Sequence, residues 1–146
     1  MSYFREERLD LETVYDQRMA AHIPLLTETD DRFYVGPSSI PAAGQGLFAR
    51  VELKEGDRLE VVGVLVPANS NADRCTQYAD AYKFRAGDHL LIPIGWGAMI
   101  NHHADANLEK IVEDGVVCLR AVRRIAQGEE LFFSYSLYAR ERFGLP

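Results

Sequence analysis

Residues 95–107 read GWGAMINHHADAN, one of three unusual stretches in the chain. Glycines flank the single tryptophan, an apolar segment follows, and polar side chains complete the stretch. The side chains that can hydrogen-bond or bind a metal are Asn101, His102, His103, Asp105 and Asn107. A metal site on His102, His103 and Asp105 is one interpretation, although adjacent histidines usually point apart and no cysteine pair lies nearby. A hydrogen-bonded structural loop is the other interpretation.

Upstream, residues 43–48 read AGQGLF, in which two glycines precede an apolar pair. Glycine allows a backbone to approach a ligand closely and to adopt positive φ angles. The segment opens no helix, so it does not satisfy the dinucleotide-binding pattern. By itself it is also compatible with a plain turn.

Downstream, residues 128–135 read GEELFFSY, an acidic turn that runs into an aromatic segment ending at Tyr135. Aromatic residues favour strands, so this segment alone predicts a core strand. Glu129 and Glu130 could suggest a pair of glycosidase acids. Neighbours on a strand face opposite ways, however, which makes them a poor catalytic pair.

Around these stretches the pattern from Arg32 onward is one of short strands and turns, which predicts a mainly β fold with short helices. The expected strands are Phe33–Val35, Leu47–Val51, Arg58–Val66, Ala81–Arg85, His89–Ile94, Leu108–Val112, Val116–Val122 and Leu131–Ser134. Helical signal remains only at Phe4–Met19, Asp73–Ala81 and Ser136–Phe143. Glycine turns at Gly87 and Gly115 predict two hairpins.

Residues 1–32 differ from the rest, with 4 basic and 8 acidic side chains. Residues 1–31 are therefore expected to be an N-terminal helical extension. The apolar side of the helix at Phe4–Met19 either packs on the domain or binds a partner, including a second copy in a homodimer.

Composition narrows the function classes. The chain has 146 residues, 47% hydrophobic and 26% charged, as expected for one soluble globular domain. No apolar run is long enough to span a membrane, and the charged N-terminus predicts no signal peptide. A net charge of −6 argues against direct nucleic-acid binding and suits a basic partner. The two cysteines, Cys75 and Cys118, exclude a disulfide scaffold and suit a reducing, cytoplasmic location.

In this order and spacing, the three stretches resemble the SET-domain family of protein-lysine methyltransferases, particularly small stand-alone microbial or viral members. The family's Gly-x-Gly and apolar pair match Gly44, Gly46, Leu47 and Phe48. Its Asn-His-Ser-x-x-Pro-Asn stretch is similar to residues 101–107, and its Gly-Glu-Glu-Leu-x-x-x-Tyr stretch matches residues 128–135. The resemblance covers residues 31–138. It implies a SET domain at 32–138, folded as a β-clip with a C-terminal pseudoknot, and a tail at 139–146 that closes the site.

The resemblance also implies a site. S-adenosyl-L-methionine would be the cofactor, with S-adenosyl-L-homocysteine as product and no metal. The residues expected to bind the cofactor are Gly44, Gln45, Gly46, Leu47, Phe48, Asn101, His102, Tyr138 and Phe143. Tyr135 would be catalytic and would orient the amine of a substrate lysine. Tyr82 and Phe133 would line the lysine channel, although Tyr82 equally suits a strand core.

The implied reaction is methylation of the ε-amine of lysine in a basic protein or peptide. Phenylalanine at position 133, two residues before the tyrosine, implies that more than one methyl group can be added. The departures from the family pattern are His103 for serine, Ala106 for proline and Ser134 for aspartate. These departures keep open a catalytically degenerate SET-like module that binds protein or cofactor. A metal enzyme built on His102, His103 and Asp105 is a further alternative. If the protein comes from a eukaryote, a virus or a pathogen, the expected location is instead the nucleus or a host cell.

Overall fold

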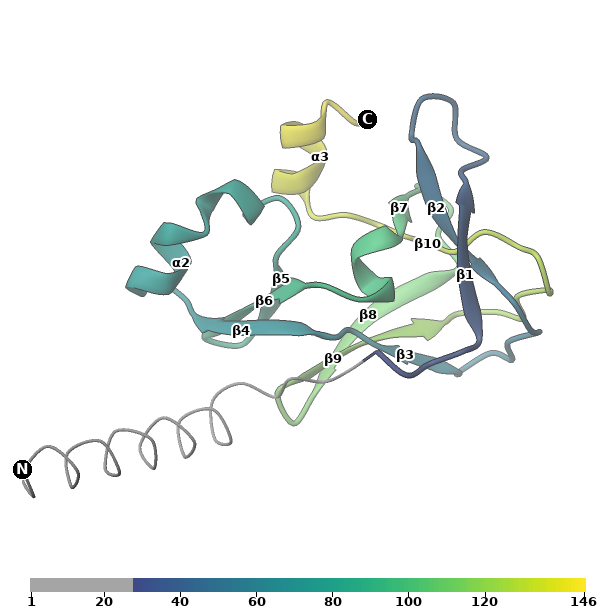
Figure 1. Ribbon diagram of the computed structural model, residues 1–146, viewed down its shortest axis with the longest axis horizontal. Coiled ribbons are helices and arrows are strands. Elements are labelled where there is room, and N and C mark those ends of the chain that lie inside the picture. Colours follow the sequence, from purple (N-terminus) through teal and green to yellow (C-terminus); the bar gives the residue numbers. More distant parts are fainter. Residues whose placement is uncertain (1–27) are drawn as a thin grey trace, which may run out of the picture.

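The computed structural model describes residues 28–146 and shows small twisted sheets joined by turns (Figure 1). The strands are β1 (Phe33–Pro37), β2 (Gln45–Ala49), β3 (Arg58–Glu60), β4 (Gly63–Pro67), β5 (Phe84–Ala86), β6 (His89–Pro93), β7 (Asn101–His102), β8 (Leu108–Glu113), β9 (Val116–Ala121) and β10 (Phe132–Phe133). The helices are α2 (Asn71–Cys75) and α3 (Leu137–Phe143), with short 3₁₀ turns η1 (Gln77–Ala79) and η2 (Trp96–Met99). The predicted mainly β class with short helices is confirmed.

The strands fall into three sheets rather than one. β1 pairs with β2, β4-β6-β5 form a three-stranded sheet, and the order β3-β9-β8-β10-β7 forms a five-stranded sheet. In Figure 1, α3 lies between the β1–β2 hairpin and the α2 segment in this view. None of the helices among residues 28–146 is long and apolar enough to cross a membrane.

The expected strand at Arg58–Val66 is wrong as a single element, because it divides into β3 and β4. Val61 and Val62 are both buried, whereas neighbours on a straight strand face opposite sides. The Val61 amide donates to the Val117 carbonyl, while the Val62 carbonyl accepts from the Ile94 amide. The chain therefore passes from one sheet to the next at this pair.

Turn chemistry sets the two hairpins. Asp114 and Gly115 adopt φ angles of 51° and 77° between β8 and β9, which matches the twist of the flanking strands. Gly87, at φ 63°, turns the chain between β5 and β6. Both predicted hairpins are confirmed, although the expected strand Ala81–Arg85 is wrong at its start, since β5 begins only at Phe84.

The terminal helix begins and ends at recognisable caps. The Ser136 hydroxyl accepts from the Ala139 amide at 3.2 Å, and Gly144 ends α3 with φ 66°. The helical signal expected over Asp73–Ala81 becomes α2 and η1, separated at Thr76. The helix predicted at Phe4–Met19 lies outside the described residues. The assigned boundaries 1–31, 32–138 and 139–146 remain predictions.

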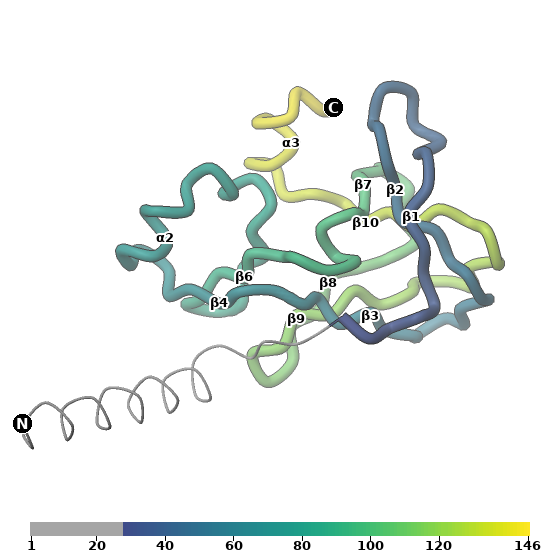
Figure 2. Tube along the Cα trace, in the orientation of Figure 1, coloured from purple at the N-terminus to yellow at the C-terminus, as the bar shows by residue number. Residues whose placement is uncertain are grey.

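The C-terminal strand is inserted between two strands that are close in sequence. β10 pairs in parallel with β7 on one side and with β8 on the other. Residues 103–107, which connect β7 to β8, therefore cross over the C-terminal segment, as the chain trace in Figure 2 shows. This crossing is the expected pseudoknot. Ile100, Leu108 and Leu131, at 2%, 4% and 0% exposed, anchor its strands in the common core.

Candidate active site

Asn107 holds the crossing in place. Its side chain is 1% exposed and completes the backbone pairing of the inserted segment. Its amide oxygen accepts from the Phe132 amide at 2.8 Å, and its amide nitrogen donates to the Glu130 carbonyl at 2.8 Å. Asparagine suits this position because one side chain supplies both a donor and an acceptor.

Glu130 ties the glycine segment to the same crossing. Its carboxylate accepts from the hydroxyls of Ser38 and Ser39 at 2.7 and 2.5 Å, and from the Ser39 amide at 2.8 Å. Burial raises the pKa of Glu130, but these hydrogen bonds outweigh burial and hold the pKa below its ordinary value. A Cβ at Gly46 would lie 2.2 Å from a Glu130 oxygen, so only glycine fits there without a shift. Asn101 joins the cluster by donating to the Gln45 carbonyl at 2.9 Å.

His102 and Tyr135 are in contact at the crossing. The Tyr135 amide donates to Nδ1 of His102 at 2.9 Å, and the two rings lie 5.3 Å apart. Burial lowers the pKa of His102, and the charges of Arg140 and His103 add to this. A neutral imidazole is what this hydrogen bond requires, because Nδ1 has to accept.

A hydrogen bond to the backbone fixes the orientation of the Tyr135 hydroxyl. It donates to the Ile100 carbonyl at 2.6 Å, directly before Asn101. Burial raises the pKa of Tyr135 to about 12, with a smaller contribution from Tyr82. The phenol is therefore protonated at neutral pH, and its hydroxyl has a fixed orientation.

Tyr135 faces a cavity of about 670 Å³. The cavity lies among α2, the segment 80–83 that precedes β5, the β5–β6 sheet, η2, β8, β10 and α3, and is within the size range of small-molecule sites. Its aromatic lining consists of Tyr82, Phe84, Phe133, Tyr135 and Tyr138. Phe133 stacks on Phe84 with ring centres 5.3 Å apart and lies 4.8 Å from the Tyr135 ring. The structure thus brings the expected channel residues Tyr82 and Phe133 to one cavity with Tyr135.

The residues expected to bind the cofactor separate into two places. Asn101 contacts the Gly44–Gly46 segment, as described above. Leu47 is fully buried and exposes no atom to a ligand, and the Phe48 ring stacks on Tyr34 at 5.4 Å. Tyr138 instead lines the Tyr135 cavity, and the Phe143 ring lies 5.2 Å from Tyr82. The role of each of these residues stays a prediction.

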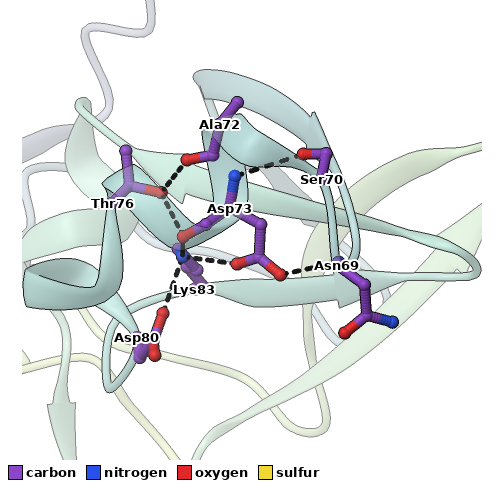
Figure 3. A network of polar contacts seen from close by, with 7 residues as sticks. All are labelled: Asn69, Ser70, Ala72, Asp73, Thr76, Asp80 and Lys83. Carbon is purple, nitrogen blue, oxygen red and sulfur yellow. Dashed lines mark hydrogen bonds and ion pairs between the residues drawn. The ribbon is translucent and has the colours of Figure 1, made fainter.

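The structure also shows residues that the sequence patterns did not single out. The side chain of Lys83 is buried, and its ammonium contacts the carboxylates of Asp73 at 2.7 Å and Asp80 at 2.6 Å (Figure 3). Burial lowers the pKa of Lys83, but the two carboxylates outweigh this and raise it. The network joins α2 and the end of η1 to the turn segment that leads into β5. The sequence gives no signal for this network, because lysine and aspartate are common residue types on protein surfaces.

The histidines of the loop are engaged in backbone hydrogen bonds. Nδ1 of His103 accepts from the Asp105 amide at 2.9 Å, which closes the turn that a serine would occupy in the family pattern. Within residues 28–146, no three His, Cys, Asp or Glu side chains gather closely enough to hold a metal ion.

Two features of the described chain fit S-adenosylmethionine. β7 is the edge strand of its sheet, so one row of its backbone groups has no neighbouring strand, and a purine ring needs such donors and acceptors. Arg140 has a buried Nε with no hydrogen-bond partner among the described residues, and its charge acts on His102. An acceptor on a bound ligand would satisfy that nitrogen.

A knotted β-clip with a backbone-bound tyrosine facing an aromatic cavity defines the class of protein as a SET-type methyltransferase fold. The SET domain family model matches residues 44–136, and the chain therefore belongs to the SET domain family. This is a methyltransferase family, so the resemblance carried by the three sequence stretches is confirmed. A comparison with curated proteins found no match.

Solved structures of Polycomb Repressive Complex 2 are similar to this chain. The Chaetomium thermophilum complex bound to GSK126 is 25% identical with a TM-score of 0.62, covering 77% of this chain and 17% of that chain. A humanized mutant of that complex with the same inhibitor is 27% identical with a TM-score of 0.60, covering 71% and 15%. A structure of the complex in an autoinhibited conformation bound to S-adenosylmethionine, 24% identical with a TM-score of 0.61, shows the shared fold and covers 77% and 16%. This chain thus spans about a sixth of the length of those chains.

Proposed function

We propose that this protein transfers methyl groups from S-adenosylmethionine to the ε-amine of lysine in a protein or peptide. The observation that carries the proposal is the Tyr135 hydroxyl, fixed on the Ile100 carbonyl between the aromatic cavity and the Asn101–His102 strand. Family membership and a structural neighbour bound to S-adenosylmethionine support it.

Cofactor binding is proposed at the Gly44–Gly46 segment, the open edge of β7 and the Arg140 guanidinium. When bound, the cofactor supplies a methyl group on a positively charged sulfur. The chain's part would be alignment, with the Tyr135 hydroxyl, held on the Ile100 carbonyl, orienting the substrate amine toward that methyl group. Alignment of this kind contributes about 7–11 kcal/mol to lowering a barrier.

The cavity favours a neutral amine. A free lysine has a pKa of about 10.4, so a substrate ammonium has to lose its proton before it attacks. Aromatic walls disfavour the charged form by desolvation, and the cations Arg85 and Lys110 in the lining add repulsion. The methylated product remains held by cation–π attraction to Tyr82 and Phe133.

We also propose that more than one methyl group is added. Phe133 lines the cavity beside Tyr135 without a hydroxyl that would order a water there. A cytoplasmic site of action and a homodimer formed through residues 4–19 remain proposals from the sequence alone.

The decisive experiment uses Tyr135→Phe with Tyr78→Phe as the matched control, since Tyr78 is 83% exposed. We expect Tyr135→Phe to lose methyl transfer by about 100-fold or more, because the oriented hydroxyl is gone. Calorimetry should show S-adenosylmethionine binding retained in both variants. Wild-type turnover in Tyr135→Phe contradicts the role of the hydroxyl, and no cofactor binding by the wild type favours a non-catalytic SET-like module.

A further inference from the structure

The residues that line the Tyr135 cavity have a net charge opposite in sign to that of the whole chain. The chain carries a net charge of −6, yet the described cavity lining holds the carboxylates Asp73 and Asp80 against the cations Lys83, Arg85 and Lys110. The local balance is therefore positive on an acidic protein.

The two cavity carboxylates are already paired. Lys83 contacts both of them at 2.7 and 2.6 Å, and its side chain is only 2% exposed (Figure 3). The Asp73 carboxylate also accepts from the Asn69 amide at 2.8 Å. These hydrogen bonds hold the pKa of Asp73 below its ordinary value, so the carboxylate stays ionised on Lys83. Little acidic capacity remains in the cavity for a basic substrate side chain.

Arg85 and Lys110 are the cations that remain. Among residues 28–146 neither forms an ion pair with a carboxylate, and Arg85 donates only to the Gly87 carbonyl at 3.3 Å. Burial and the charge of Arg85 lower the pKa of Lys110, as expected for two cations facing the same space.

Both cations are close to the aromatic channel. Arg85 and Lys110 both line the cavity that Phe133 and Tyr135 line. Lys110 follows Leu108 by two positions in β8, and Leu108 pairs with Phe133 in β10. The pair therefore lies beside the ring that borders Tyr135, and not on a remote face.

We infer that Arg85 and Lys110 are specificity-determining residues that select substrates with an aspartate or glutamate close to the target lysine. This inference rests on the proposed function, because it assigns the cavity to a lysine-bearing peptide. It narrows the expected basic partner to a protein or peptide that carries an aspartate or glutamate near the modified lysine. The cations line the same cavity as Tyr135, and an extended peptide advances about 3.3 Å per residue, so we expect the acid within about three positions of the lysine.

The test measures peptide binding by fluorescence anisotropy on the full chain with S-adenosyl-L-homocysteine present. Each short peptide carries one lysine and an aspartate placed from the third position before it to the third after it. The matched peptides carry asparagine in place of aspartate. We expect the best aspartate peptide to bind about fivefold more tightly than its asparagine partner, with the preference weakening at high salt.

Charge-reversed variants assign the preference to the cations. Arg85→Glu with Lys110→Glu should lose the aspartate preference and favour a peptide carrying arginine at the same position. The neutral double variant Arg85→Gln with Lys110→Gln should lose the aspartate preference without reversing it. This variant keeps the test valid if the charge-reversed variant does not fold. Lys54→Glu, on an exposed turn and outside the cavity lining, should keep the wild-type preference.

The outcomes separate this inference from the proposed function. Equal binding of every aspartate and asparagine pair by the wild type, or an unchanged preference in the neutral double variant, overturns the inference. Absence of methyl transfer to all peptides, with the aspartate preference present and lost on substitution, overturns the proposed activity and leaves the recognition of acid-flanked lysine standing.

Discussion

Single side chains do the work of backbone pairing and orientation at the centre of this protein. The amide of Asn107 bonds two backbone groups of the inserted segment, and the imidazole of His102 accepts the Tyr135 amide. The Tyr135 hydroxyl is in turn fixed on the Ile100 carbonyl. Each contact joins positions more than twenty residues apart, so each one fixes the relation between distant parts of the chain.

Phe133 sets the space beside Tyr135. Phe133→Tyr adds a hydroxyl that can bind a water in the cavity, which leaves less room for a methylated amine to turn. We expect the wild type to give di- or trimethylated product and Phe133→Tyr to stop at monomethyl lysine. Mass spectrometry of saturating reactions measures this. Only monomethyl product from the wild type, unchanged in Phe133→Tyr, refutes the multiple-methylation proposal.

The protonation of His102 couples pH to stability. Its pKa in the folded protein lies below the ordinary value of 6.5, chiefly because of burial, so the unfolded chain binds protons more readily near that pH. This residue therefore contributes a loss of stability as pH falls below about 6.5, and none above it. We expect an NMR titration to place the imidazole midpoint below 6.5. A midpoint above that value contradicts the assigned environment.

At the scale of elements, the segment of α2 and η1 has little apolar anchoring. α2 has no buried residues, and Ala79 is the buried residue of η1. The Lys83 network supplies what packing does not, because it connects Asp73 in α2 and Asp80 after η1 to the chain entering β5. One wall of the cavity thus depends on three charges.

Lys83→Met tests this dependence. The substitution leaves Asp73 and Asp80 facing each other without their cation, but both carboxylates retain some solvent access, at 18% and 35% exposed. We expect a loss of about 1–3 kcal/mol in the free energy of unfolding, less than for a fully buried pair. Denaturant unfolding measures the loss, with exposed Lys54→Met as control. Equal stability of the two variants shows that the network is dispensable.

For the whole molecule, the decisive feature is the crossing of residues 103–107 over the C-terminal strand. It brings Asn101, His102 and Tyr135 together although the tyrosine lies over thirty residues later in the chain. β10 pairs over very few residues, so side-chain contacts such as those of Asn107 reinforce the insertion. Site and global fold are therefore coupled.

Asn107→Ala should weaken the entire fold rather than one loop. It leaves the Phe132 amide and the Glu130 carbonyl without their partner in a position that is 1% exposed. We expect a cost of about 2–4 kcal/mol in the free energy of unfolding. Asn71→Ala, exposed on α2, should cost much less. Hydrogen exchange should report the loss across both β7 and β8, and a loss confined to residues 103–107 speaks against the coupling.

Local pattern was sufficient for the hairpins and for the terminal helix. Asp114-Gly115 fixes a tight turn through backbone angles alone, and Ser136 and Gly144 define the ends of α3. The strand expected over 58–66 was wrong because two adjacent valines are both buried, which depends on the sheets on either side. Periodicity within a segment does not carry that information.

The sequence by itself determined the family, because three short stretches with these residue types in this order are specific to it. It also indicated Tyr135, Phe133 and Tyr82 as site residues. Tertiary structure alone decided that these three share one cavity, that Lys83 pairs with two aspartates, and that Arg85 and Lys110 remain without carboxylate partners among the described residues. The physical reason is that backbone turns and residue types act over a few positions. Charge pairing and cavity lining, by contrast, depend on which distant strands the knot brings together.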